Sequence, residues 1–210
     1  MGILIAGYLG AMYNKLGNAV GSNWKGINTI RTYAIPANPQ SVLQTAQRTK
    51  FKTVSLFAKS VLSTLVTTFW NPFAVQMSGY NFLVKTIFPD SSATGILTAS
   101  CKVAKGSLET VPILSALYNN LSGELTLFWN ATILGNGLDT DTINVLVVNN
   151  VNNSVNYYAT NIDARSAGET LLTIPTGLVV ANMLVYIWAS RGTGSDFMVS
   201  DSFGVIASVS

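Results

Sequence analysis

The chain has 210 residues, of which 49% are hydrophobic and only 10% are charged, and its formal net charge is +3 at pH 7. Soluble domains average roughly 25% charged residues, so we expect a surface of Ser, Thr, Asn and apolar groups that favours association. The sequence contains no histidine, which excludes Ser-His-Asp and Cys-His catalysis, HExxH zinc sites and most transition-metal sites. We therefore expect a protein that is not an enzyme and that has no cofactor and no metal site.

The first 35 residues alternate short β-compatible runs with glycine and asparagine, as in GILIAGYLGAMY, KLGNAVGSNW and GINTIRTYAI. This pattern predicts a small sheet or an extended arm. The opening lacks the basic residues of a secretory signal, and Ala6 stands where a myristoylation motif has Ser or Thr, so we expect mature structure. Because no apolar run of about 18 residues occurs, we expect no membrane partner.

An amphipathic helix is predicted after residue 38. Asn38 can cap this helix, and Pro39 can occupy its first position, where a missing N–H costs nothing. Arg48, Lys52 and Lys59 lie away from the apolar stripe, so one face should be buried and the other basic. The β-branched stretch SVLSTLVTTF weakens the helix prediction towards its end. The apolar stripe consists of Leu43, Ala46, Phe51, Val54, Ala58, Val61 and Leu65.

Two shorter segments complete the first half of the chain. NPF at 71–73 repeats the Asn cap and Pro start. SGYNFLVKTIF predicts a further short segment that ends at Pro89. We define residues 1–94 as a basic α+β module of short glycine-punctuated strands plus two or three helices.

From about Lys102 onward the hydrophobic period is two, which predicts strands. No helical interlude separates them, so we expect an antiparallel sandwich. The segments LTLFWN and MLVYIWAS resemble the Trp-bearing second strand and the Tyr-bearing sixth strand of a fibronectin type III or related immunoglobulin-like domain. The resemblance implies an immunoglobulin-like sandwich over 95–210, which we expect to fold alone. The predicted strands are an edge strand near 111–120 and the runs 123–130, 142–150, 154–161, 169–175, 182–190 and 197–208.

The charges are separated along the chain. Residues 1–89 carry eight basic residues and no acidic one, and therefore sum to +8. Residues 90–210 carry four basic and nine acidic residues, and therefore sum to −5. Halves of opposite sign favour docking of one copy on another or on an acidic neighbour. Nucleic acid is a disfavoured partner, because the cations are spread out rather than clustered.

Other motifs have structural explanations that we weigh above functional ones. GTGSD lacks the lysine of a phosphate-binding loop, so a turn is expected there. Cys101 is expected to be a buried small hydrophobe. Asp139 with Asp141, and Asp196 with Asp201, lack EF-hand spacing and should be loop carboxylates. A carbohydrate-active enzyme would need two acids converging in a cleft, for which Glu124 and Glu169 are unsupported candidates.

The N-terminal half contains a set of motifs that is more specific. They are a G-x-x-x-G-S-x-W-K-G start, an Arg before P-x-N-P, a Q-x-x-Q-R-x-K-F helix and a closing SGYN. These motifs resemble an uncharacterised group in Bacteroidetes and tailed bacteriophages, several of which carry the provisional name of virion structural proteins. The resemblance implies a phage-particle context, often with a β-rich C-terminal domain, and no mechanism. The matching residues are Gly17, Gly21, Ser22, Trp24, Lys25, Gly26, Arg31, Pro36, Asn38, Pro39, Gln44, Gln47, Arg48, Lys50, Phe51, Ser78, Gly79, Tyr80 and Asn81.

These observations lead to a first functional hypothesis. We expect a non-enzymatic structural protein of a bacteriophage particle, located in the virion as capsid decoration or as a tail or fibre component. Its partners would be identical subunits and other virion proteins. The alternative is a cell-surface binding module or adhesin that uses the loops 135–141, 149–154 and 191–196. The candidate interface residues are Trp24, Lys25, Arg31, Arg48, Lys50, Lys52, Lys59 and Tyr80.

Overall fold

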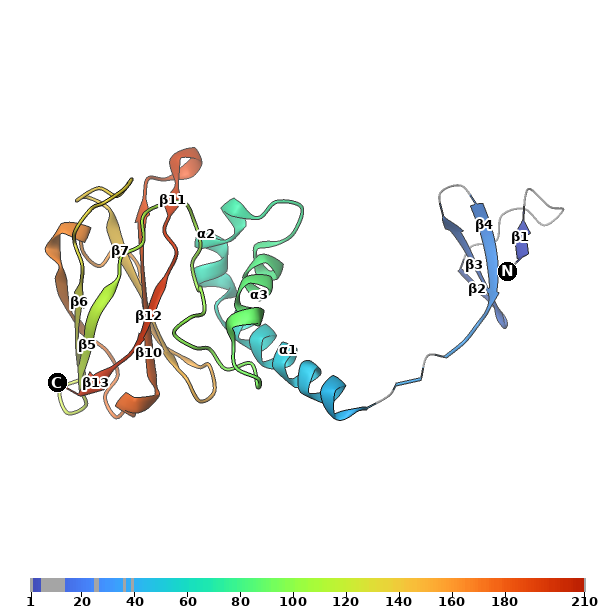
Figure 1. The fold of residues 1–210 in the computed structure, drawn as a ribbon, viewed down its shortest axis with the longest axis horizontal. Helices are drawn as coiled ribbons and strands as arrows, with labels where there is room; N and C mark the ends of the chain where they lie inside the picture. The colour runs from blue at the N-terminus through green and yellow to red at the C-terminus, as the bar shows by residue number, and fades with distance from the viewer. Residues whose placement is uncertain (1, 5–13, 25–26, 36, 39, 210) are drawn as a thin grey trace. The chain divides into compact units, whose positions relative to one another are not determined.

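The computed structural model describes residues 2–4, 14–24, 27–35, 37–38 and 40–209 (Figure 1). The chain divides into two compact units, Met1–Ser41 and Val42–Ser210. Each unit is described by itself below.

The first unit is a four-stranded antiparallel sheet with the strand order β1-β4-β3-β2. A two-residue turn joins β2 to β3, and its first residue, Gly17, has a positive φ of 57°, as such hairpin turns require. Across β3 and β4, the hydroxyls of Ser22 and Thr29 are 2.8 Å apart. Of the two predicted alternatives, the structure has the sheet. Its strands are β1 (Gly2–Leu4), β2 (Asn14–Leu16), β3 (Ala19–Trp24) and β4 (Ile27–Thr32).

The second unit begins with helices, which we call the helical layer. The long helix starts at Val42, three residues after Pro39, so the predicted cap at Asn38 is wrong. The β-branched stretch forms a π-helical turn in which Thr67 Oγ1 donates to the carbonyl of Leu62 at 2.8 Å. The last helix starts after Ser78, whose hydroxyl accepts from the Asn81 amide. The layer consists of α1 (Val42–Ser60), η1 (Leu62–Val66), α2 (Thr67–Phe69), η2 (Asn71–Phe73) and α3 (Gly79–Asp90).

The rest of the second unit forms two sheets, which we call the outer sheet and the middle sheet. The outer sheet has the order β13-β5-β6-β9, and only β13 pairs in parallel. It comprises β5 (Ile113–Asn119), β6 (Glu124–Trp129), β9 (Glu169–Thr173) and β13 (Ser208–Val209). In the middle sheet β10 pairs with β7 on one side and with both β11 and β12 on the other, and β8 flanks β7. It comprises β7 (Thr142–Asn149), β8 (Val155–Ala159), β10 (Met183–Arg191), β11 (Met198–Val199) and β12 (Phe203–Ile206), and short 3₁₀ turns lie at η3 (Arg165–Ala167), η4 (Val180–Asn182) and η5 (Gly194–Asp196).

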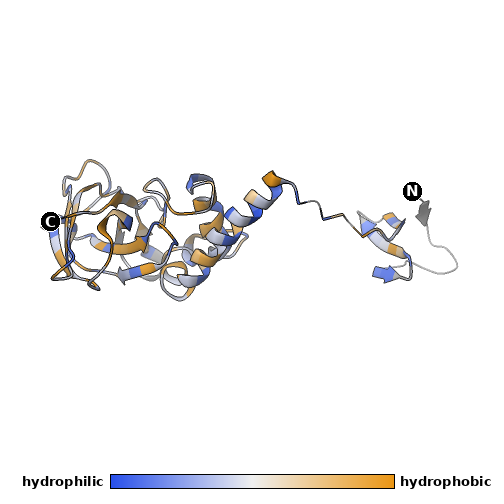
Figure 2. Ribbon diagram, turned by 90° about the horizontal axis from the view of Figure 1, so that it is seen from below, coloured by the Kyte–Doolittle hydropathy of each residue, from blue (hydrophilic) through white to orange (hydrophobic). Residues whose placement is uncertain are grey.

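The middle sheet is buried on both faces. Residues such as Val145, Val185 and Ile187 pack against the outer sheet, whereas Tyr186 and Trp188 pack against the helices. The second unit therefore has three layers, namely helices, middle sheet and outer sheet (Figures 1 and 2). Burial on both faces explains why β7 and β10 are almost continuously apolar.

The expected α+β class, with several antiparallel sheets, is confirmed. The expected boundary between 94 and 95 differs from the structure, which divides the chain between 41 and 42. The physical reason is the shared core, since α1 and α3 bury Val54, Phe57 and Leu83 in the same cluster as Tyr186 and Trp188. The helices belong with the sandwich.

Candidate functional site

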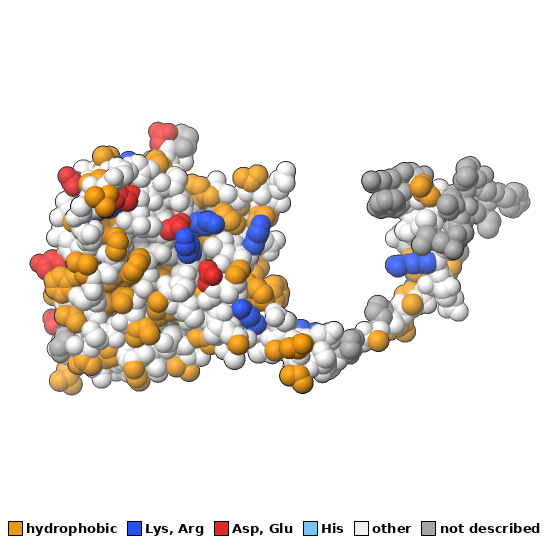
Figure 3. All heavy atoms as spheres, in the orientation of Figure 1, with side chains coloured by type: hydrophobic (Ala, Val, Ile, Leu, Met, Phe, Trp, Pro, Cys, Tyr) orange, Lys and Arg blue, Asp and Glu red, His pale blue; other side chains and the backbone are white. Residues whose placement is uncertain are grey.

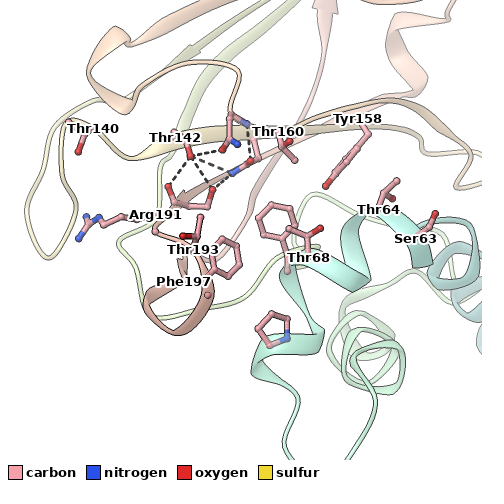
Figure 4. A pocket seen from close by; sticks show the side chains of 17 residues that line it. Ser63, Thr64, Thr68, Thr140, Thr142, Tyr158, Thr160, Arg191, Thr193 and Phe197 are labelled. Atoms are coloured by element: carbon pink, nitrogen blue, oxygen red, sulfur yellow. Dashed lines mark hydrogen bonds between the residues drawn. The ribbon is translucent and has the colours of Figure 1, made fainter.

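A cleft of about 910 Å³ lies between the helical layer and one end of the middle sheet (Figure 4). This volume is in the range of roughly 300–1,000 Å³ that is typical of ligand pockets. Figure 4 shows Thr68 and Thr64 on the helical side and Thr142, Thr160 and Tyr158 on the sheet side. The remaining lining residues are Ser63, Phe69, Pro72, Thr140, Asn144, Asn161, Ser190, Arg191, Gly192, Thr193, Gly194 and Phe197.

A hydrogen-bond network fixes the sheet side of the cleft. Thr142 Oγ1 donates to Asn161 Oδ1 at 2.8 Å and is 3.1 Å from Ser190 Oγ. The buried Asn144 donates from Nδ2 to Ser190 Oγ at 2.9 Å and to the Trp188 carbonyl at 3.2 Å. Its Oδ1 accepts from the Asn161 amide at 3.1 Å. Since buried polar groups need partners, this network satisfies the groups that the end of the sheet buries.

Arg191 is the only charged side chain among the described residues that line the cleft. Its Nε donates to Asp141 Oδ1 at 2.5 Å, and its Nη2 donates to Asp141 Oδ2 at 2.8 Å and to the Asn136 carbonyl at 3.0 Å. The hydrogen bond with Asp141 raises the pKa of Arg191. Asp141 is fully buried, so the guanidinium compensates its charge, and the cleft carries no net charge from this pair.

Aromatic rings form the apolar part of the cleft. Tyr158 stacks on Trp188 with ring centroids 6.5 Å apart, and Phe69 meets Trp188 edge to face at 5.2 Å. Phe197 lies 5.7 Å from Phe69. Burial raises the pKa of Tyr158 to about 12, so its phenol is neutral at physiological pH. Within the described ranges, the buried Trp188 Nε1 has no hydrogen-bond partner.

Two of the three loops expected to bind a ligand meet at this cleft. Arg191 and Asn136 join the loops 135–141 and 191–196 through their hydrogen bond. The loop 149–154 follows the opposite end of β7 and does not line the cleft. There, Asn153 accepts from the Leu97 amide and donates to the Gly95 carbonyl, both at 2.9 Å. Sequence reasoning missed the lining residues of the strands, although a polar Asn144 inside the apolar run TINVLVV was a usable signal.

The predicted basic face of α1 exists. Arg48, Lys52 and Lys59 are all exposed. Their spacing places them within about 40° of arc on the helix. Lys50 instead contacts its own chain, since its Nζ donates to the Ser91 carbonyl at 3.1 Å and lies 4.8 Å from the Phe88 ring centroid.

The remaining predicted interface residues do not lie on the basic face of α1. The Tyr80 hydroxyl donates to the Ser55 carbonyl at 3.2 Å, which ties α3 to α1. Arg31 is exposed on β4 of the first unit. Trp24 is the last residue of β3, and its side chain lies outside what the structure describes, as does Lys25.

The start of α1 carries an apolar stripe that the second unit does not cover. Residues 42–49 are all exposed, and Leu43 and Phe51 have exposed fractions of 80% and 55%. The stripe was predicted to be core along its whole length, but only Val54 and the later members are buried, because α1 extends beyond its contacts with α3. A shallow groove of about 450 Å³ adjoins it, lined by Phe51, Tyr80, Asn81, Val84, Lys85 and Phe88. We call this surface, together with Arg48, Lys52 and Lys59, the helical face.

The solvent side of the outer sheet has the opposite charge, and we call it the acidic face. Leu171, 61% exposed, lies opposite Thr126 in the register, and the half-buried Phe128 lies opposite Glu169. Glu124 and Glu169 are both exposed, at opposite ends of this row. Figure 3 shows basic side chains over the helices of this unit and acidic side chains along the edge of the outer sheet.

The remaining chemistry-bearing residues have structural partners. Cys101 is buried as expected, and burial raises the pKa of its thiol. Asp201 forms an ion pair with Lys102 and accepts from the Gly106 amide. In the part of the chain that the structure describes, no group of three or more metal-ligating side chains comes together. No helix of that part is both long and apolar enough to cross a membrane.

The comparisons with known proteins place the chain in a family. Residues 11–204 match a family of unknown function, DUF6266, and the chain belongs to that family. None of the curated proteins matches the chain, and none of the solved structures does either.

Proposed function

We propose that the protein is a non-enzymatic structural subunit that assembles head to tail, with the helical face of one copy against the acidic face of the next. The observation that carries this proposal is the complementarity of the two faces. Each has an exposed apolar centre, with Leu43 and Phe51 on one and Leu171 on the other. Arg48, Lys52 and Lys59 lie about 60–100° around α1 from Phe51 and nearly opposite Leu43, so they flank the Phe51 side of the first centre. Glu124 and Glu169 border the second centre.

The spacing of the charges supports the same docking. Arg48 and Lys59 are separated by about 16 Å along α1. Glu124 and Glu169 are separated by about 13 Å along the strands. Helix α1 of one copy is therefore long enough to contact both Glu124 and Glu169 of the next copy at once. Exposed ion pairs contribute only about 0.2–1 kcal/mol each, so the apolar centres must supply most of the affinity and the charges the orientation.

Head-to-tail contacts use two different surfaces of each subunit, and they generate rings or open filaments rather than closed dimers. Such geometry suits a repetitive particle. The bacteriophage context, with location in the virion as capsid decoration or as a tail or fibre component, rests on the resemblance of the N-terminal motifs given above. We also propose that the two sheets form an immunoglobulin-like sandwich of the fibronectin type III kind, which the orders β5-β6-β9 and β8-β7-β10-β12 support.

Light scattering on the full chain over a range of protein and salt concentrations tests the assembly. The wild type should form oligomers that salt weakens, because exposed charges are screened. The double variants Arg48→Glu/Lys52→Glu and Glu124→Lys/Glu169→Lys should both be monomeric. An equimolar mixture of the two double variants should recover the association, because each face of one variant then meets a face of opposite charge on the other.

Lys105→Glu is the matched control, because Lys105 is exposed and lies on neither face, so its reversal should leave association unchanged. A wild type that is monomeric at every concentration would refute the proposal. Oligomers that persist in both double variants would refute the choice of faces.

The second candidate function is a cell-surface binding module or adhesin. It is favoured by the cleft, to which the loops 135–141 and 191–196 both contribute.

A further inference from the structure

The rim of the cleft offers hydroxyl and amide groups that the protein leaves unused. Among the residues that the structure describes, the Thr160 and Thr193 hydroxyls, the Tyr158 phenol and Asn161 Nδ2 form no hydrogen bond. Asn161 is held in place through its backbone amide and its Oδ1, so its Nδ2 is a positioned donor. Hydroxyls both donate and accept, which suits a partner that also carries hydroxyls.

The charges of the cleft restrict the class of ligand. Three of the five N–H donors of Arg191 bind Asp141 and the Asn136 carbonyl, and Asp141 neutralises its charge, so Arg191 offers an anion little net attraction. No carboxylate lies among the described lining residues, so a cation has no counter-charge. The many hydroxyls and amides make the cleft too polar for a purely apolar ligand, since burial would leave them unpaired.

The aromatic rings provide the apolar surface of the cleft. Tyr158 and Phe197 both line the cleft and are half-buried, and each is backed by another aromatic ring, Trp188 and Phe69. The electron-rich face of an aromatic ring attracts positively polarised C–H groups. A sugar ring presents such C–H groups on one face and hydroxyls around its edge.

We propose that this cleft binds a neutral saccharide, with Thr160, Asn161 and Tyr158 addressing its hydroxyls. The proposal goes beyond structural assembly, and it does not depend on it. The same chemistry is offered by free sugars and by the sugar units of a surface polysaccharide.

An array of immobilised neutral and acidic oligosaccharides, probed with the full chain, tests the proposal. We expect saturable binding to neutral members, confirmed by calorimetry with the free oligosaccharide and with its polymer. Tighter binding of the polymer than of the free sugar would identify the polysaccharide as the source, and equal affinity per sugar unit would identify the free sugar. Thr160→Val, Asn161→Asp and Tyr158→Phe should each weaken binding by about 3- to 10-fold, which corresponds to one lost hydrogen bond.

Thr173→Val is the matched control, because Thr173 is exposed on β9 of the outer sheet, and it should bind like the wild type. Thr160 is exposed, so Thr160→Val tests the site even if the other variants are destabilised. The variant Arg48→Glu/Lys52→Glu should also bind normally, so failure of assembly and failure of sugar binding are separable. Absence of binding to every neutral member, a preference for acidic members, or unchanged affinity in all three cleft variants would overturn the proposal.

Discussion

Removal of the helical layer should abolish stable folding of the sandwich. A fragment of residues 95–210 keeps both sheets but exposes the side of the middle sheet that faces the helices. That side carries Leu146, Val148, Leu184, Tyr186 and Trp188, all with exposed fractions of 1% or less. The structure therefore predicts the opposite of the expectation that 95–210 folds alone.

The cost can be worked from burial. Each of these five side chains contributes roughly 1.5–3 kcal/mol through removal from water, so their complete exposure would cost on the order of 10 kcal/mol. Residues 97–104, which the fragment keeps, belong to the same cluster and cover part of this side, so the figure is an upper bound. Whole domains are stable by only about 5–15 kcal/mol. The loss is therefore comparable with the entire free energy of unfolding, and an exposed apolar sheet face also promotes aggregation.

The assay compares the fragments 42–210 and 95–210 by circular dichroism, urea denaturation and light scattering. The fragment 42–210 corresponds to the second compact unit and should unfold cooperatively. The fragment 95–210 should be aggregated, or should lack a cooperative transition. A monomeric 95–210 with the same urea midpoint as 42–210 would show that the helices are an accessory and that the shared core is energetically unimportant.

Two further predictions concern the second unit. At Gly204 on β12, a Cβ would lie 2.6 Å from Tyr186 Cε1 and 2.8 Å from the Ala99 carbonyl oxygen, so Gly204→Ala should lower the free energy of unfolding by about 1–3 kcal/mol in urea denaturation. The hydrogen bond from the Leu134 amide, helped by that from Gly135, lowers the pKa of Glu109 below 4.5. Glu109 should therefore stabilise the fold above about pH 4.5, and this contribution should disappear as the pH falls through its folded pKa. Glu109→Gln should be less stable at pH 7 and lose less stability on acidification.

These two predictions have distinct controls. Gly135→Ala has no heavy atom closer than 3.7 Å to the added Cβ, so it should cost much less than Gly204→Ala. Equal effects of the two glycine substitutions would show that β12 moves to relieve the contact. If the free energy of unfolding of Glu109→Gln depends on pH in the same way as that of the wild type, the hydrogen bonds of the Glu109 carboxylate do not contribute to stability, and the prediction is wrong.

Local pattern was sufficient to predict most of the elements. The alternation in ELTLFW and the turn residues at 151–153 fix β6 and the β7–β8 hairpin, because side chains in a strand alternate between faces. The predicted helix cap at Asn38 is wrong because α1 starts at Val42, directly after Ser41, another residue type that is favoured at the N-cap.

The layer order could not be derived from alternation alone. The runs VLVV in β7 and MLVYIWA in β10 are apolar at successive positions, which is typical of strands buried on both faces. That pattern indicated a covering layer but not which segment supplies it. The structural roles of Lys50 and Tyr80, which were predicted to be interface residues, could not be derived from the sequence either. Their contacts with Ser91 and Ser55 depend on how α3 packs on α1.

The cleft lies where the side of the middle sheet that faces the helices changes from apolar to polar residues. On the side that faces the helices, β7 reads Thr142, Asn144, Leu146, Val148, and β10 reads Ser190, Trp188, Tyr186, Leu184 opposite them. The apolar part of both rows is covered by helices, and the polar part is where the cleft opens. A helix that covered Thr160 and Asn161 at this end would bury further polar groups without adding apolar contacts, which is unfavourable. The boundary between apolar and polar residues on two neighbouring strands therefore determines where the helical layer separates from the sheet.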